Sequence, residues 1–273
     1  MRVVRFRRGG RPRYGILEGE GRIRPLEGPP FRGLRPRAET IPVSEVRLLA
    51  PCTPTKIIGV GLNYRDHAAE LGLPVPDEPM LFLMPGTAVI GPGDKILYPE
   101  MSRRLDYEGE LAVVIGRRAC GVREESAGDH IFGYTCFNDV TARDLQARDG
   151  QFTRAKGFDS FAPMGPWIET ELDPAGLTVE TLLNGRRVQN ASTDQLVFDC
   201  RALVSFVSRI MTLLPGDVIA TGTPSGIGPM IPGDQVEVRI QGIGSLTNEV
   251  AGPGTRPGRW PTGRAGAETE ETG

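Results

Sequence analysis

Glycine and proline recur so often in this chain that they limit the length of every regular element. The 273 residues include 36 glycines and 24 prolines, about 22% of the chain, against an average near 12% for the two. Both residues interrupt helices and favour turns and bulges. Short strands should therefore outnumber long helices, and the sequence predicts a β-rich fold.

Hydrophobic periodicity places the elements between these interruptions. Alternating or continuous apolar runs predict strands at 81–83, 111–115, 133–139 and 178–182. Asn184-Gly185 predicts a hairpin turn because both residues tolerate positive φ. Apolar residues at three- and four-residue steps predict the longest helix within 194–214. A shorter helix is predicted at 63–71, with Asn63 as its cap.

Changes in composition divide the chain into three parts. Residues 1–50 contain eleven arginines before residue 40 and short alternating stretches, which predict a small N-terminal β module. Residues 51–250 hold the remaining apolar runs and are expected to form one domain, which is long enough to bury its own core. Two Pro-Gly-Asp turns, at 215–217 and 232–234, each lead into a predicted strand. Residues 251–273 are polar and without period, so we expect a flexible tail.

Composition excludes several protein classes. With 39% hydrophobic residues, 24% charged residues and a net charge of -2, the chain has the composition of a globular protein. No apolar stretch approaches the roughly 18 residues of a membrane span, and no secretory leader is recognisable, so we expect no membrane partner. Four scattered cysteines without a C-x-x-C pair favour a reducing, cytoplasmic location. The arginine-rich front lacks a nucleic-acid motif, and solvated strand faces are favoured over a polyanion site.

Two glutamates mark a candidate cation site. Glu108 and Glu110 alternate at the start of an apolar strand, so in an extended chain they share one face about 6.5–7 Å apart. Neighbouring carboxylates beside buried sequence need a cation, and Mg2+ or Ca2+ prefers oxygen ligands. Solvated glutamates at an exposed strand start are the alternative. A third carboxylate, Asp139, ends another strand, where it is either functional or the cap of the following helix.

Polar side chains that could act on a substrate lie on predicted helices. His67 and Glu70 are three residues apart, so imidazole and carboxylate can touch, as in a general base or in a modest surface ion pair. Arg143 and Gln146 share a helix face in the same way. Lys156 is one of only three lysines among 32 basic residues, which marks its compact ammonium group for attention.

Several separate motifs, taken in order, resemble the fumarylacetoacetate hydrolase family. They are NYRDHAAEL, DYEGELAVVIG, GYTCFNDVTARDLQ, AKGFDSFAPMGPW, LNGRRVQ, IATGTPSGIG and PGDQVEVRIQGIGSLTNEV, and they cover about residues 55–250. The resemblance implies an α+β, β-rich fold built on a mixed β-roll, which usually forms homodimers. It also implies a Mg2+ or Mn2+ ion held by three carboxylates, which match Glu108, Glu110 and Asp139.

The resemblance implies roles for six further residues. Lys156 resembles the family's active-site lysine, and His67 and Glu70 resemble the catalytic dyad of a mobile lid. Arg143 and Gln146 resemble its substrate-side polar residues, and Thr223 lies where the substrate carboxylate is often held. Met84 stands where many members have lysine, so one cationic contact is missing.

The activity implied by the resemblance is chemistry on small 2-oxo or 2-hydroxydienoic acids through a metal-stabilised enolate. The motifs look most like isomerase and decarboxylase members of aromatic catabolism that act on 2-hydroxyhepta-2,4-diene-1,7-dioate and related acids. An acylpyruvate hydrolase or oxaloacetate decarboxylase that uses His67 and Glu70 is the alternative. A non-catalytic polyanion-binding protein is a remote third possibility.

Overall fold

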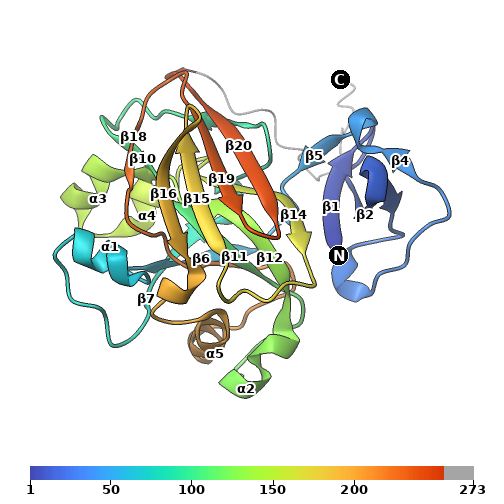
Figure 1. Ribbon diagram of the computed structural model, residues 1–273, viewed down its shortest axis with the longest axis horizontal. Helices are drawn as coiled ribbons and strands as arrows, with labels where there is room; N and C mark the ends of the chain where they lie inside the picture. Colours follow the sequence, from blue (N-terminus) through green and yellow to red (C-terminus); the bar gives the residue numbers. More distant parts are fainter. Residues whose placement is uncertain (255–273) are drawn as a thin grey trace, which may run out of the picture.

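A computed structural model of the chain describes residues 1–254, and strands dominate it (Figure 1). The largest sheet contains twelve strands. Ten of them form a continuous path, which runs β4 (Ile41–Pro42), β3 (Arg22–Pro25), β2 (Arg13–Glu18), β1 (Arg2–Arg7), β14 (Ala162–Glu169), β12 (Ile131–Asn138), β11 (Gly109–Ile115), β17 (Val218–Ala220), β6 (Lys56–Gly61) and β7 (Met80–Pro85). Off this path, β5 (Arg47–Leu49) pairs with β1, and β8 (Val89–Ile90) pairs with β14.

Two smaller sheets complete the β structure. The first runs β16 (Arg186–Ser192), β15 (Thr178–Leu183), β19 (Gln235–Ile240), β20 (Gly244–Ala251) and β9 (Lys95–Leu97). The second runs β13 (Thr141–Ala142), β10 (Leu105–Tyr107) and β18 (Gly228–Met230). The five-stranded sheet packs on the large one, because Val179, Val238 and Leu246 share an apolar cluster with Leu111 and Val113 of β11. The prediction of a β-rich α+β fold is confirmed.

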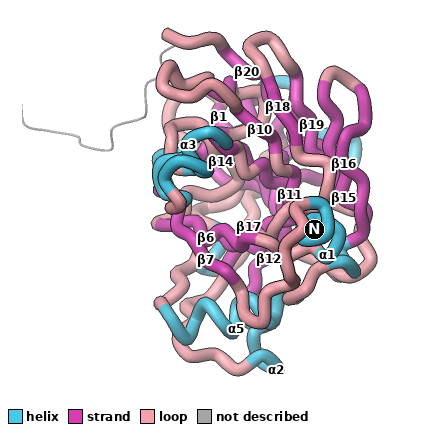
Figure 2. The backbone as a smooth tube through the Cα atoms, turned by 90° about the vertical axis from the view of Figure 1, so that its left-hand side faces the viewer, coloured by secondary structure: helices cyan, strands magenta, loops and turns pink. Residues whose placement is uncertain are grey.

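The helices are short. They are α1 (Arg65–Glu70), α2 (Glu124–Ala127), α3 (Arg143–Asp149), α4 (Phe152–Lys156) and α5 (Cys200–Ile210). Single 3-10 turns are η1 (Gly19–Gly21), η2 (Pro30–Arg32), η3 (Val43–Glu45), η4 (Gly86–Ala88), η5 (Gly128–His130) and η6 (Thr193–Gln195). Helices α2 and α5 lie at the opposite end of the molecule from β20 (Figures 1 and 2).

Strand β11 is the centre of the fold. All seven of its residues are buried, since it lies between β12 and β17 in the large sheet and is covered by the five-stranded sheet. A strand covered on both faces needs a continuous apolar run, which Leu111–Ile115 supplies. The two glutamates at 108 and 110 therefore enter the core with this strand.

The longest helix is shorter than its sequence pattern predicts. Helix α5 begins at Cys200, because the Asp199 carboxylate accepts hydrogen bonds from the N–H groups of Arg201 at 2.8 Å and Ala202 at 2.9 Å. This side chain caps the helix and fixes its start. Helix α5 therefore lies within the predicted segment 194–214 and is the longest helix in residues 1–254, as predicted, but it covers only residues 200–210.

The predicted cap of the first helix was wrong. Helix α1 begins at Arg65, and Asn63 lies before it with its side chain turned toward other loops. The Asn63 amide donates to the carbonyls of Thr221 at 2.7 Å and Phe198 at 3.0 Å, and accepts from the Phe198 N–H at 2.9 Å. Asn63 therefore ties two loops to the end of β6.

The predicted turns are confirmed. Asn184 and Gly185 have φ of +52° and +79° and join β15 to β16. Positive φ at both central residues is the type I′ geometry that suits a two-residue hairpin. The turns at 215–217 and 232–234 lead into β17 and β19, as their spacing predicts.

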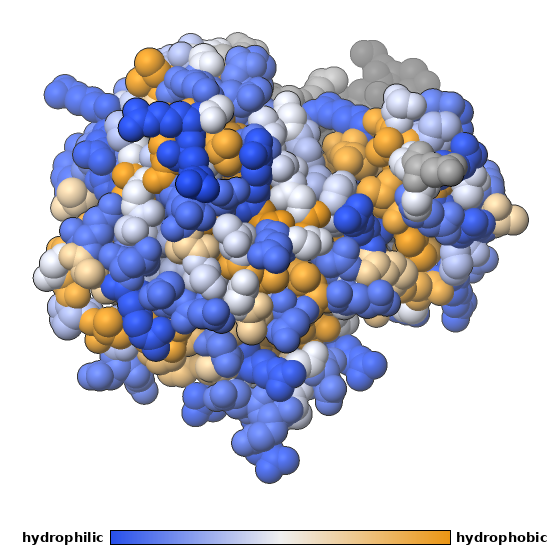
Figure 3. All heavy atoms as spheres, in the orientation of Figure 1, coloured by the Kyte–Doolittle hydropathy of each residue, from blue (hydrophilic) through white to orange (hydrophobic). Residues whose placement is uncertain are grey.

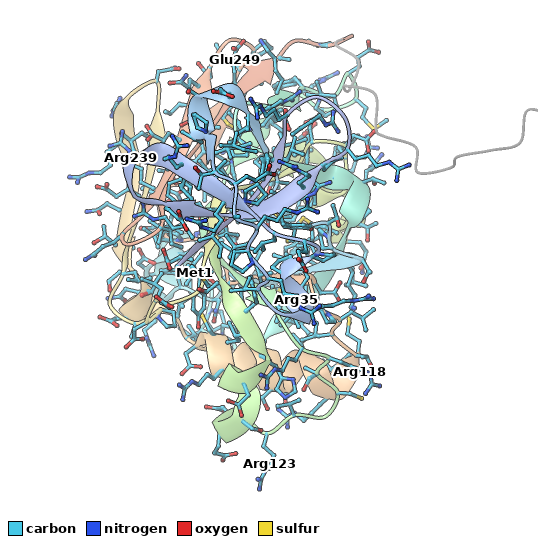
Figure 4. All side chains as sticks on the ribbon, turned by 90° about the vertical axis from the view of Figure 1, so that its right-hand side faces the viewer. Met1, Arg35, Arg118, Arg123, Arg239 and Glu249 are labelled. Carbon is cyan, nitrogen blue, oxygen red and sulfur yellow. The ribbon has the colours of Figure 1, made fainter. Side chains whose placement is uncertain are left out.

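The N-terminal strands extend the large sheet, since β1 pairs with β14. Several arginines of this part form surface ion pairs, including Arg24 with Glu18 at 2.6 Å and Arg13 with Glu39 at 3.4 Å. Figure 4 views the molecule from this side. Of the segment predicted as a tail, 251–273, the first residue closes β20, and residues 255–273 lie outside the described structure.

Across residues 1–254 the helices are all too short or too polar to cross a membrane.

Candidate active site

Three carboxylates converge inside the large sheet. Glu108 joins β10 to β11, Glu110 lies on β11, and Asp139 follows the last residue of β12. Antiparallel pairing of β11 with β12 places Glu110 opposite Phe137, and the Asp139 N–H donates to the Glu108 carbonyl at 2.8 Å. All three side chains are buried, and one oxygen atom of each lies within 4.8 Å of the others. The structure therefore brings the three predicted metal ligands to one point.

Lys156 lies between two of these carboxylates. From the end of α4, its Nζ atom donates to Asp139 Oδ2 at 2.5 Å, Thr141 Oγ1 at 2.9 Å and Glu108 Oε2 at 3.0 Å. Burial opposes the charged form, but Asp139 and Glu108 outweigh it and raise the pKa of Lys156 above its ordinary value. The side chain is therefore an ammonium group and a hydrogen-bond donor. It also lies 5.0 Å from the centre of the Phe82 ring.

Arg143, the first residue of α3, supplies the second positive charge. Its Nε atom donates to Asp106 Oδ2 at 2.9 Å, its Nη1 atom donates to Gln146 Oε1 at 2.5 Å, and its Nη2 atom contacts Glu108. Burial alone would raise the pKa of Glu108, but Lys156 and Arg143 together lower it to about 2. Glu108 is therefore ionised at neutral pH.

Within residues 1–254, no cationic side chain forms an ion pair with Glu110. Its Oε2 atom accepts a hydrogen bond from the Gly222 N–H at 2.8 Å. Burial, with Asp139 and Glu108 nearby, raises the pKa of Glu110 well above its ordinary value. Burial also raises the pKa of Asp139 to about 6, despite the opposing effect of Lys156. The other oxygen of Asp139, Oδ1, is buried and has no hydrogen-bond partner within residues 1–254.

The donor set therefore fits a divalent cation. Three carboxylates face two positive groups, and a buried carboxylate oxygen is left unpaired. Hard cations such as Mg2+ take oxygen ligands of this kind, and a second positive charge near Glu110 and Asp139 would favour their ionised forms.

The predicted dyad is assembled on α1. His67 Nδ1 lies 2.9 Å from Glu70 Oε2, and the His67 side chain is buried. The other oxygen of Glu70 accepts from the Gly226 N–H at 2.9 Å, and Asp66 Oδ2 accepts from the Ser225 hydroxyl at 2.9 Å. These bonds fasten α1 to the loop that contains Gly222, whose N–H binds Glu110.

The segment after α1 is exposed. Leu71, Leu73 and Val75 are 46%, 48% and 45% accessible. Hydrophobic residues are visible at the lower left of the face in Figure 3, where this segment runs in Figure 1. The lid that the family resemblance implies would comprise α1 and this exposed segment, and its movement stays a prediction.

Thr223 lies in the same loop as Gly222, and its hydroxyl is occupied. It donates to the Gly109 carbonyl at 3.0 Å and accepts from Gln189 Nε2 at 2.9 Å. Met84 belongs to a different environment, since it is fully buried in an apolar cluster with Cys52, Ile57 and Ala88. The position at which many family members have lysine is therefore part of the apolar core in this chain.

Sequence reasoning missed residues that hold the site together. Asp106 anchors Arg143 and also accepts from Arg104 Nε at 2.9 Å. Its position two residues before Glu108 follows the same alternation and could have marked it. Thr141 and the Gly222 N–H carried no signal, because their contacts depend on how α4 and the loop after β17 dock.

Comparisons with known proteins give two family matches and several similar relatives. Residues 56–251 match the family model described as Fumarylacetoacetate (FAA) hydrolase C-terminal, and residues 1–51 match the model described as Rv2993c-like, N-terminal. Protein Rv2993c of Mycobacterium tuberculosis is 49% identical over 84% of this chain and 86% of its own length. The mitochondrial oxaloacetate tautomerase fahd2 of Xenopus laevis is 43% identical over 76% of this chain and 69% of its own length.

A solved structure is also closely similar. The 2-hydroxyhepta-2,4-diene-1,7-dioate isomerase from Mycobacterium marinum has a TM-score of 0.87 and 43% identity, with 93% of this chain and 100% of that chain covered.

Proposed function

This chain belongs to the fumarylacetoacetate hydrolase family, and from that premise we propose that it is a divalent-metal-dependent enzyme acting on small 2-oxo or 2-hydroxydienoic acids. The leading reaction is isomerisation or decarboxylation of the 2-hydroxyhepta-2,4-diene-1,7-dioate type, in aromatic catabolism. One observation carries the proposal: the buried carboxylates of Glu108, Glu110 and Asp139 converge with too little positive charge beside them. These three residues would hold Mg2+, or Mn2+, because such ions prefer oxygen ligands.

The bound ion would supply Lewis-acid chemistry that polarises the 2-oxygen of the substrate. Lys156 acts beside it, since its buried positive charge would stabilise an oxygen that gains negative charge as an enolate forms. The three N–H groups of its ammonium are bonded to Thr141, Glu108 and Asp139, so a direct hydrogen bond to the substrate would require one of these bonds to be released.

The substrate-binding groups follow from the same contacts. Arg143 is oriented by Asp106 and donates to Gln146 Oε1. We assign both Arg143 and Gln146 to the binding of substrate oxygens. The Thr223 hydroxyl is already bonded to Gly109 and Gln189. We therefore assign the backbone N–H of Thr223, rather than its hydroxyl, to the substrate carboxylate.

His67 and Glu70 are assigned to proton transfer. Glu70 binds His67 Nδ1, so Nε2 is the ring atom that exchanges a proton. In an isomerisation, this atom would take the proton from one position of the dienoate and return it at another. Closure of α1 and its following segment over the substrate would exclude water from this exchange.

A C–C bond hydrolase or oxaloacetate decarboxylase is the second candidate. The preassembled His67–Glu70 pair favours it, because the same base can activate a water molecule. The similarity to a protein named oxaloacetate tautomerase adds keto–enol interconversion of that acid to the reactions worth assaying.

The test is the ultraviolet absorbance of 2-hydroxyhepta-2,4-diene-1,7-dioate with purified protein, first in Mg2+ and then in excess chelator. We expect decay that needs the metal and that Glu110→Gln abolishes. If there is no decay although calorimetry detects bound Mg2+, the dienoate assignment fails, and acylpyruvates and oxaloacetate become the substrates to assay. Activity of Glu108→Ala at the wild-type rate would refute the site itself.

We also propose that the protein is a cytoplasmic homodimer. Strand β7 is at the edge of the large sheet and exposes Met80 and Leu83, which a second copy could cover. The cysteines in residues 1–254 are all unpaired, as is usual in a reducing compartment. Light scattering at micromolar concentration tests the dimer.

A further inference from the structure

A cavity lies at the opposite end of β12 from the three carboxylates. Its volume is about 840 Å³, within the range of cavities that bind small molecules. Its walls come from α2, η5, the first residues of β12, segment 170–175, η6 and the start of α5, in the lower part of Figure 1. Tyr134 in this wall and Asp139 are five residues apart, which is about 16 Å along a strand. The cavity is therefore distinct from the proposed active site.

The rim of this cavity is strongly acidic. Five of its six charged lining residues are carboxylates, and the sixth is an arginine; they are Glu125, Asp129, Asp173, Asp194, Asp199 and Arg201. All six are exposed, and five carboxylates against one guanidinium give them a formal net charge of -4. A cationic ligand suits this rim.

Tyr134 adds to the wall a hydroxyl that has no protein partner within residues 1–254. The residue is only 8% accessible. Burial raises the pKa of Tyr134, so its hydroxyl stays protonated. The residue lines the cavity, where its solvent-accessible hydroxyl could donate to or accept from a ligand in place of water.

The shape of the site excludes a bare metal ion. Within residues 1–254, the single group of three ligand atoms closer than 4.8 Å is Glu108, Glu110 and Asp139. The rim carboxylates are instead distributed over separate segments around a large space. Between them the lining includes the apolar side chains of Ile131, Leu172, Pro174 and Leu196. A fitting ligand needs separated positive charges and an apolar body.

We propose that this cavity is a binding site for an organic polycation of the aliphatic polyamine class. Its ammonium groups pair with the rim carboxylates, one of them reaches the Tyr134 hydroxyl, and its methylene chain lies on the apolar lining of Ile131, Leu172, Pro174 and Leu196.

The experiment is isothermal titration of the full-length protein with spermidine at constant ionic strength. Saturating Mg2+ is present throughout, so that the carboxylates of the proposed active site do not compete for the polyamine. We expect one site per chain. Glu125→Gln and Tyr134→Phe should each weaken binding about tenfold, because each removes a polar contact to a charged group. Arg201→Ala should strengthen binding severalfold, because it removes a like charge.

Helix α2 offers a matched control. Glu124 and Glu125 are adjacent and exposed, but only Glu125 lines the cavity, so Glu124→Gln should bind like the wild type. Equal losses for Glu124→Gln and Glu125→Gln would overturn the proposal, since they would mean unspecific attraction. Absence of spermidine binding by the wild type would also overturn it. Melting curves establish that each variant is folded, and the surface change at Glu125 carries the test if Tyr134→Phe is not.

Discussion

Replacing Lys156 with methionine removes the charge that lies between Glu108 and Asp139. The variant keeps the apolar chain but leaves two buried carboxylates without their shared ammonium group. Breaking a buried ion pair by removing one partner costs about 3–5 kcal/mol. In a domain of this size, 1 kcal/mol lowers Tm by about 2–4 °C, so Lys156→Met should melt about 6–20 °C below the wild type in chelator.

Mg2+ should recover much of this loss, because the ion supplies the missing positive charge to the same carboxylates. The assay is thermal unfolding followed by circular dichroism, in excess chelator and in saturating Mg2+. The Mg2+-induced rise in Tm should be larger for Lys156→Met than for the wild type. A loss that is equal in both buffers would refute the reasoning, as would a variant that melts like the wild type in chelator.

The other two lysines provide matched controls. Lys95 pairs with Glu249 on the surface, where such pairs contribute less than about 1 kcal/mol, so Lys95→Met should change Tm little. Lys56 pairs with Asp217, which is fully buried. The Asp217 carbonyl accepts from the Ile115 N–H, at the opposite end of β11 from Glu110. Lys56→Met should therefore lower Tm by the same amount with and without Mg2+.

Three further predictions concern the same region. The pKa of Glu110 is raised, so the metal-free fold loses stability as pH rises above 4.5 and Glu110 ionises, whereas Mg2+ binds the ionised form. The Mg2+-induced rise in Tm should therefore grow between about pH 5.5 and 8. In a series of melting curves, Glu110→Gln should remove this growth. Asp106→Asn should lower Mg2+ affinity about 10- to 100-fold by releasing Arg143, as isothermal titration would measure, and unchanged affinity would contradict this role. Asn63→Ala removes three hydrogen bonds and should cost about 2–4 kcal/mol in urea unfolding, while a loss below about 1 kcal/mol would contradict the tie between loops.

Much of the fold could be predicted because its signals are local. The apolar run Leu111–Ile115 and the positive-φ pair at Asn184-Gly185 need no knowledge of distant residues. Helix ends were less predictable. The apolar period continues before Cys200, but the Asp199 cap stops the helix there, and periodicity alone does not decide between them.

The site, like the fold, was predictable where the signal is local and not where it depends on distant residues. Alternation alone put Glu108 and Glu110 on one face, and the same rule would have included Asp106. What brings Asp139 to them is the register of β12 on β11, in which Glu110 faces Phe137. Sequence periodicity does not determine that register. Only the family resemblance predicted that Asp139 joins the two glutamates.

The charge balance explains why these residues belong together. Glu108 has both Lys156 and Arg143 as partners, whereas Glu110 has only the Gly222 N–H. A site evolved for stability alone would pair its buried carboxylates fully, since an unpaired buried charge is costly. The uneven pairing instead leaves Glu110 without a cationic partner in residues 1–254 and one oxygen of Asp139 unpaired, and a divalent cation would complete the balance. The charge imbalance of this donor set is thus the strongest physical argument for the proposed metal-dependent chemistry.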